Sequence, residues 1–225
     1  MKQISPAIIM SFLVPAMTLM LVFGGVARRF GIDARGLKWG AGLALMSLGL
    51  LMIPVDSLPL ARWLAGIVDH WSVPLVAILA SAVARRFLGI ELLRRKDWQT
   101  AWIFGVGAGL ALYPQALGWG PLDPYALGWQ FGPLFIAMAA LTALLLWRQS
   151  RFGVVLLLAI AAWHLHASES ANYWDCLVDP FYFLISLGWV VSRLVRAAAT
   201  PKTLTATAQP DTLTRADYAD DKAPS

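Results

Sequence analysis

Charged residues are scarce in this chain of 225 residues, of which they make up 14%. A soluble domain usually carries about 25%, and a chain of this length still leaves roughly a quarter to a third of its surface in water. Hydrophobic residues make up 59% of the sequence, which is too much for such a surface. The composition therefore excludes a soluble enzyme, a DNA-binding domain and a disordered protein, and it predicts a protein that crosses a membrane several times.

Cysteine and nucleotide-binding motifs are also scarce or missing. Cys176 is the single cysteine, which excludes an intrachain disulfide and a cysteine-based zinc site. We expect it to be a small apolar packing residue. The sequence has no Walker loop and no dinucleotide fingerprint, so a primary pump acting alone is not expected. The net charge of +5 does not indicate nucleic acid, because the basic residues form short clusters between apolar runs.

The sequence does contain seven apolar segments, each of which we interpret as a membrane-spanning helix. A helix needs about 20 predominantly apolar residues to cross a bilayer. The predicted spans are residues 6–27, 39–55, 64–84, 100–119, 128–147, 152–166 and 176–195. The predicted fold is thus an all-α, polytopic bundle of transmembrane helices over residues 1–196. Residues 197–225 have too little apolar surface to fold and are predicted to form a disordered cytoplasmic tail.

The distribution of Lys and Arg predicts the orientation of this bundle. With seven alternating spans, 16 of the 18 basic residues fall on one side, and only Lys2 and Arg62 fall on the other. The positive-inside rule makes the basic side cytoplasmic. The N-terminus is therefore expected outside and the C-terminus inside, in a bacterial inner membrane.

The tryptophans agree with this arrangement, because aromatic rings prefer the headgroup level of a bilayer. Ten of the 11 fall near the predicted ends of spans: Trp39, Trp98, Trp102 and Trp147 inside, and Trp63, Trp71, Trp119, Trp129, Trp163 and Trp174 outside. Trp189 is the exception, since it lies more than a turn within the last span.

Ionisable residues gather at the predicted outer face, where polar groups at membrane depth suggest function. The candidate polar site consists of His164, His166, Glu169, Asp175, Asp179, Asp69 and His70. The alternative is that most of these side chains are simply solvated beyond the helix ends. Catalytic residues cannot be assigned from these residues alone.

The start of the last span is the densest part of this region. Asn172 is predicted to be an N-cap with Asp175 as its acidic partner. Asp175 and Asp179 are four residues apart and are expected to share a helix face. Asp179 precedes Pro180, which can bend a helix. We interpret Asp179 either as a structural partner for another helix, with His164 or His70 as candidate contacts, or as a functional acid.

A metal or a haem is a further possibility at this face. His164 and His166 point nearly opposite ways on a regular helix, but they share a side if the chain is already extended there. Zinc or iron would then find ligands in these histidines, Glu169 and Asp179. His70 and His164 facing one another would suit a haem. The spacing matches neither kind of site well enough to assign a cofactor.

Small residues in the fourth predicted span indicate close helix packing. Gly105 and Gly109 form a small-xxx-small pair, which lets two helix backbones approach. The partner helix belongs either to the same chain or to another membrane protein.

Taken together, these features favour a small multi-pass inner-membrane protein. Its predicted role is that of a non-enzymatic accessory, assembly or transport component, with a histidine and carboxylate region at its outer face. The alternatives are a membrane-embedded metal-dependent hydrolase with an outward-facing site and a haem-binding electron carrier.

Overall fold

The computed structural model describes residues 6–67, 70–121, 123–167 and 170–199, and this part of the chain is mostly helical. The helices and strands follow one another in this order: α1 (Pro6–Arg29), α2 (Leu37–Leu51), β1 (Pro54–Val55), β2 (Leu58–Pro59), α3 (Leu60–Ile67), α4 (Val73–Val83), the π-helical turn η1 (Ala84–Leu88), α5 (Arg95–Ala116), the 3₁₀ turn η2 (Tyr125–Gly128), α6 (Pro133–Trp147), α7 (Arg151–His164), α8 (Tyr173–Leu177) and α9 (Pro180–Ala199). The all-α prediction is confirmed, apart from one two-stranded hairpin. The predicted tail lies outside the described residues from residue 200 onward.

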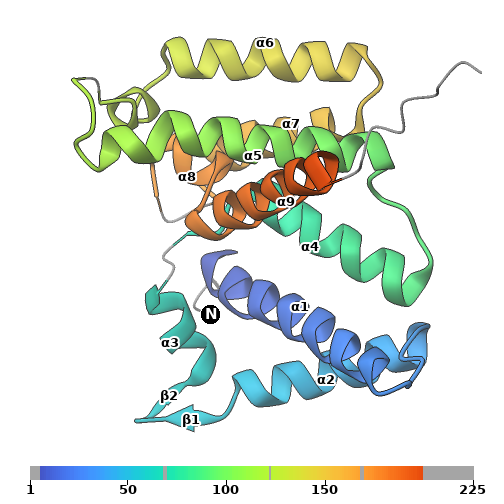
Figure 1. Cartoon of the computed structure of the whole chain (residues 1–225). Helices are drawn as coiled ribbons and strands as arrows, with labels where there is room; N and C mark the ends of the chain where they lie inside the picture. The colour runs from blue at the N-terminus through green and yellow to red at the C-terminus, as the bar shows by residue number, and fades with distance from the viewer. Residues whose placement is uncertain (1–5, 68–69, 122, 168–169, 200–225) are drawn as a thin grey trace, which may run out of the picture.

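The long helices alternate in direction, so their ends gather at two opposite ends of the molecule (Figure 1). We call one of them the hairpin end, because it carries the β1–β2 hairpin, α3, η2 and α8. The other is the arginine end, where α1, η1 and α9 finish and α5 and α7 begin. Its basic residues include Arg28 and Arg29 in α1, Arg85 and Arg86 in η1, Arg95 at the start of α5 and Arg151 at the start of α7.

Two of the predicted spans are each divided between two helices. The segment 64–84 is shared by α3 and α4, and α4 starts afresh with Ser72 as its N-cap and Pro74 in its first turn. The segment 176–195 is broken at Val178, whose extended backbone (φ −149°, ψ 133°) separates α8 from α9. Each new helix has a proline in its first turn, Pro74 in α4 and Pro180 in α9, and proline suits this position because it has no backbone N–H.

The second predicted span is shorter than expected because a hairpin replaces its end. Helix α2 stops at Leu51, and Pro54–Val55 pairs antiparallel with Leu58–Pro59. Asp56 and Ser57 both have positive φ (47° and 70°), as a tight two-residue turn requires. The residues between the second and third predicted spans, 56–63, are therefore partly a hairpin and partly the start of α3.

Two helices of the described chain are long and apolar enough to cross a membrane, namely Ile8–Arg29 within α1 and Pro180–Ala199 in α9. Helices α2, α6 and α7 are apolar but shorter, with 14 or 15 residues each. A helix of that length rises only about 22 Å, compared with about 30 Å for a hydrocarbon core.

Helix α9 packs along α5, and the two glycines of α5 lie at this contact. A Cβ atom at Gly105 would come within 2.3 Å of Ser186 Oγ, and one at Gly109 within 2.1 Å of Phe183 Cδ2. Only glycine allows this approach. The pair is therefore used for packing within the chain, and α9 covers the face that the sequence also offered to a membrane-protein partner.

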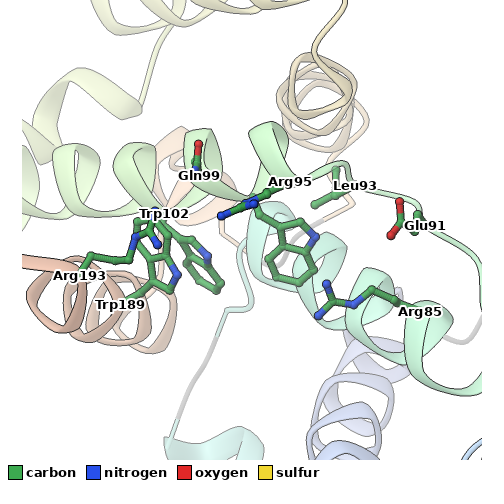
Figure 2. Close-up of a pocket in the computed structure, with 9 residues that line it drawn as sticks. Arg85, Glu91, Leu93, Arg95, Gln99, Trp102, Trp189 and Arg193 are labelled. Atoms are coloured by element: carbon green, nitrogen blue, oxygen red, sulfur yellow. The ribbon is translucent and has the colours of Figure 1, made fainter. Parts of the chain in front are cut away.

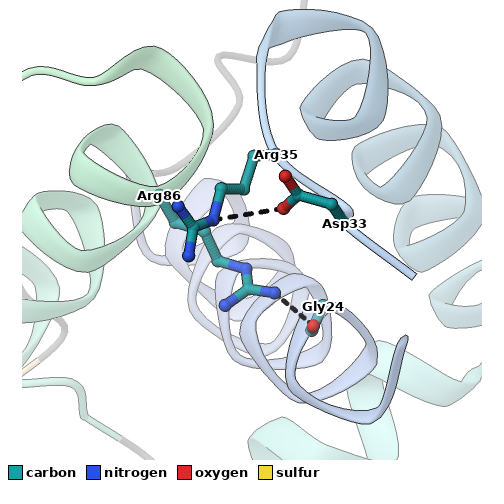
Figure 3. A network of polar contacts seen from close by, with 4 residues as sticks. All are labelled: Gly24, Asp33, Arg35 and Arg86. Carbon is teal, nitrogen blue, oxygen red and sulfur yellow. Dashed lines mark hydrogen bonds and ion pairs between the residues drawn. The ribbon is translucent and has the colours of Figure 1, made fainter. Parts of the chain in front are cut away.

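Helix α1 is held against η1 by an arginine that reaches into a gap left by a glycine. Arg86 donates a hydrogen bond to the backbone carbonyl of Gly24 (Figure 3). A Cβ atom at Gly24 would lie 2.7 Å from Arg86 Nε, so a larger residue would displace the guanidinium. Nearby, Arg35 forms an exposed ion pair of 3.2 Å with Asp33.

Candidate functional site

Asp179 occupies the break between α8 and α9, and its carboxylate is buried. Its side chain is 2% exposed, and Ser72, on the neighbouring chain segment, is fully buried. Oδ2 of Asp179 accepts hydrogen bonds from Ser72 Oγ at 2.6 Å and from the Ser72 N–H at 3.0 Å. Oδ1 accepts the N–H of Tyr182 at 2.8 Å. Asp179 is therefore the N-cap of α9 and is also bonded to the N-cap of α4.

This contact joins the N-termini of two helices through one carboxylate. The N-terminus of a helix carries partial positive charge and free N–H groups, which favour an anion. Three donors satisfy the carboxylate without a counter-charge. The structure thus gives Asp179 a structural partner on another helix, as one of the two sequence interpretations required. The partner is Ser72, however, and neither of the proposed histidines hydrogen-bonds to the carboxylate.

Asp175 faces a different set of groups. Its Oδ2 accepts a hydrogen bond from the Tyr125 hydroxyl at 3.0 Å and another from Ser170 Oγ. The expectation that Asp175 and Asp179 share a helix face is wrong, because the chain is extended at Val178 between them. The two carboxylates hold different elements: Asp175 binds the η2 turn, and Asp179 binds α4.

The Tyr125 hydroxyl remains protonated over the whole physiological range. Burial, and then the negative charge of Asp175, raise the pKa of Tyr125 to about 12. A neutral phenol is the form that can donate to a carboxylate. The tyrosine therefore stays a donor in this contact at neutral pH.

Asn172 is confirmed as the N-cap of α8. Its Oδ1 accepts the N–H of Trp174 at 3.0 Å, and its Nδ2 donates to the carbonyl of Tyr125 at 2.9 Å. Asp175 supports this cap through Ser170 rather than directly, since Ser170 Oγ also accepts the N–H of Asn172 at 3.0 Å. A Cβ atom at Gly128 would overlap Asn172 Oδ1, at 1.8 Å, so glycine is needed where η2 meets α8.

His164 and His166 lie at the end of α7, and both are exposed. The helix ends at His164, and His166 has a positive φ of 51°. The N–H of His166 bonds to the Trp163 carbonyl and the N–H of Ala167 to that of Ala162, which is the Schellman arrangement of a helix C-terminus. The chain between the two histidines is therefore a tight turn and not the extended segment that a shared metal site would use.

Of the remaining candidates, only His70 lies within the described residues. His70 is half-buried just before α4. Asp69 and Glu169 lie outside the described residues. Within residues 6–67, 70–121, 123–167 and 170–199, no group of three or more His, Cys, Asp or Glu side chains is arranged to hold a metal ion.

Sequence reasoning missed a second buried carboxylate at the arginine end. Asp97, in the first turn of α5, is 3% exposed. It accepts hydrogen bonds from Ser150 Oγ at 2.7 Å and from the N–H groups of Arg151 and Arg94 at 3.0 and 2.9 Å. The spacing from Arg94 to Asp97, an acid three residues after a helix cap, is the signal that identifies it.

Both aspartates use the same arrangement. Each stands at the start of one helix and reaches the serine that caps another, so that Asp179 joins α9 to α4 and Asp97 joins α5 to α7. We call them the hairpin-end joint and the arginine-end joint. In both joints the carboxylate accepts hydrogen bonds from N–H and O–H donors and so holds two helices together.

No protein-family model, no curated protein and no solved structure matches this chain, so its function has to be argued from its own residues.

Proposed function

We propose that the protein is a multi-pass component of a bacterial inner membrane, with seven spans, the N-terminus outside and the C-terminus in the cytoplasm. Its proposed role is non-enzymatic: accessory, assembly or transport. In this proposal the hairpin end faces outward, its polar region holds the helices in place, and its exposed histidines meet a partner or a transported solute.

The membrane part of the proposal is supported by the direction of the helices and the charge at their ends. Helices α1, α2, α4, α5, α6, α7 and α9 alternate in direction, and the clusters of basic residues fall at one end (Figure 1). Large apolar side chains also point outward between the two ends, including Leu45 (73% exposed), Ile103 (64%) and Leu194 (64%). Such an apolar exterior favours contact with lipid.

Reporter fusions test this topology directly. A cytoplasmic signal is expected from fusions at the arginine end and an outside signal from those at the hairpin end. The cytoplasmic sites are Arg29, Lys96, Arg151 and Lys202, and the outside sites are Pro121 and Ser170. A cytoplasmic signal from the fusion at Ser170 would show that the seven-span arrangement is wrong.

The non-enzymatic role rests mainly on one observation, which is that the buried carboxylate at the hairpin end is used to join helices. Asp179 has its donors on α4 and α9, and Asp175 is bonded to Tyr125 and Ser170. Exposed ionisable side chains at this end include His164 and His166 at the end of α7 and Asp123 just before η2. A polar surface on a rigid support suits recognition of a partner.

A comparison of abundance with activity tests this division of roles. We expect Asp179→Asn to lower both the abundance of the protein in the membrane and its ability to rescue the deletion strain, because the substitution weakens the hairpin-end joint. The double variant His164→Ala with His166→Ala should be as abundant as the unsubstituted protein but should fail to rescue the deletion strain. Leu165→Ala is the matched control, since this exposed residue lies between the histidines and carries no imidazole. A fully active double-histidine variant would contradict the proposal.

Metal and absorbance measurements on the detergent-purified protein separate this role from the alternatives. Stoichiometric zinc or iron would favour the hydrolase, and a Soret band would favour the haem protein. Either result would overturn the assignment as an accessory, assembly or transport component.

A further inference from the structure

A pocket of about 590 Å³ opens at the arginine end, between the start of α5, the turn η1 with the segment that follows it, and the second half of α9 (Figure 2). This volume is within the usual range for small-molecule sites, which is about 300–1,000 Å³. Its charged lining consists of three arginines and a single carboxylate: Arg85, Arg95, Arg193 and Glu91. The pocket therefore favours an anionic ligand.

The wall of the pocket is a row of three tryptophans. The rings of Trp98 and Trp102 are 5.7 Å apart, and those of Trp102 and Trp189 are 6.3 Å apart and nearly stacked. This contact accounts for Trp189, the one tryptophan that the sequence places away from a predicted interface. An indole wall offers apolar contact beside a wet rim, as found at the headgroup level of a bilayer.

Arginines lie at both ends of this row. The Arg85 guanidinium lies 5.5 Å from the centre of the Trp98 ring, and that of Arg193 lies 5.3 Å from Trp189. Because these two ring faces already hold cations, the pocket is poorly suited to a choline group, which would need the same faces. Stacked guanidinium groups keep their N–H donors free for phosphate oxygens.

The third arginine, Arg95, has no ion-pair partner among the residues that the structure describes. Within the described chain, Arg95 is exposed, and the single ion pair found there joins Arg35 to Asp33. Figure 2 shows the Arg95 side chain extending over the pocket beside Gln99, which offers an amide donor. Arg95 also stands in the first turn of α5, so a regular helix holds its backbone in place at the edge of the pocket.

From this arrangement we propose that the pocket binds the phosphate headgroup of an anionic phospholipid, with the tryptophan row against its glycerol and upper acyl region. The inference rests on the proposed orientation, which places the arginine end at the cytoplasmic leaflet. Basic pockets between spanning helices on that side are suited to anionic headgroups. A soluble phosphate ester has the same charged chemistry but lacks the part that would contact the tryptophans.

Native mass spectrometry of the full chain in a maltoside detergent tests this proposal, because it counts bound lipids one by one. Phosphatidylglycerol and phosphatidylcholine with identical acyl chains are titrated separately. We expect one phosphatidylglycerol to bind at least about tenfold more tightly than phosphatidylcholine. The measurement does not depend on membrane orientation, so its failure is distinguishable from failure of the topology fusions.

Charge variants locate the site. Arg95→Gln combined with Arg193→Gln should weaken phosphatidylglycerol binding by roughly tenfold or more. Arg29→Gln combined with Arg148→Gln removes the same charge from exposed residues outside the pocket and should change binding by less than about twofold. Equal binding of the two lipids, or equal losses in the two double variants, would overturn the proposal.

A competition arm separates the two sources of phosphate. Glycerol phosphate at the same concentration as the lipid should displace little of it, since it has no acyl region. Full displacement would identify a site for a soluble phosphate ester and would show that the lipid assignment is wrong.

Discussion

The hairpin-end joint and the arginine-end joint use the same chemistry in different surroundings. Asp179 and Asp97 are 2% and 3% exposed, and each receives a serine hydroxyl, at 2.6 and 2.7 Å respectively. Around Asp179 the donors are buried, whereas Ser150 is half-buried and Arg151 is exposed beside Asp97. If the carboxylate is removed at the hairpin end, its buried donors have no other acceptor. At the arginine end, water can reach the donors and replace the carboxylate, so this joint should contribute less free energy.

The two joints also show what a buried carboxylate can do in an apolar helical chain. Asp179 is conspicuous in the sequence because its immediate neighbours are apolar, whereas Asp97 is inconspicuous because it directly follows Arg94, Arg95 and Lys96. In the folded chain both carboxylates join the N-terminal ends of two helices. An isolated charge in an apolar segment is therefore evidence of a helix junction as much as of an active site.

The largest expected effect comes from Asp179→Ala. The substitution leaves the N–H and Oγ of Ser72 and the N–H of Tyr182 without their acceptor. Each unsatisfied buried donor costs about 1–3 kcal/mol, so we expect a loss of at least about 3 kcal/mol in the free energy of unfolding. Denaturant or thermal unfolding of the protein in detergent measures it. If the variant is as stable as the unsubstituted chain, the hairpin-end joint does not stabilise the fold.

A smaller loss is expected from Asp97→Ala in the same assay, about 1–2 kcal/mol. The same number of donors is freed, but those of Arg94 and Arg151 belong to exposed residues that water can reach. The order of the two variants is the critical result. If Asp97→Ala lowers the free energy of unfolding as much as Asp179→Ala does, then access to water does not reduce the cost of losing the carboxylate.

Next in size is Tyr125→Phe, which tests the second carboxylate of the hairpin end. Removing the hydroxyl deletes the 3.0 Å hydrogen bond to Asp175 and should cost about 1 kcal/mol near neutral pH. An unfolded-state phenol has a pKa of about 10, and the pKa of Tyr125 in the folded chain is about 12. Because the folded state holds this proton longer, the contribution of Tyr125 is complete below about pH 10 and is lost as the pH rises toward 12. The phenylalanine variant should lose less stability over that window, and an unchanged pH profile would contradict the assigned contact.

The smallest expected effect is the coupling between the two joints. They lie at opposite ends of the molecule, join different pairs of helices and share no hydrogen-bond partner. The double variant Asp179→Ala with Asp97→Ala should therefore lose the sum of the single losses, within about 0.5 kcal/mol. A larger coupling energy in this double-mutant cycle would mean that the four joined helices respond as one unit.

The sequence by itself determined the features that depend on local composition and periodicity. The helical class, a helix within each apolar segment, the cap at Asn172 and the clustering of basic residues all follow from the order of residues along the chain. These properties are local, since they depend on neighbours within one or two turns.

Only the tertiary structure decided which side chains meet. Nothing in the sequence relates Asp179 to Ser72, which is 107 residues away, or Asp97 to Ser150, 53 residues away. The same holds for Trp102 and Trp189, and for Gly109 and Phe183. The reason is that the rotation of a helix about its own axis and its choice of neighbour depend on packing against the whole bundle. A pattern within one helix therefore shows that a polar or small residue needs a partner, and the fold alone supplies that partner.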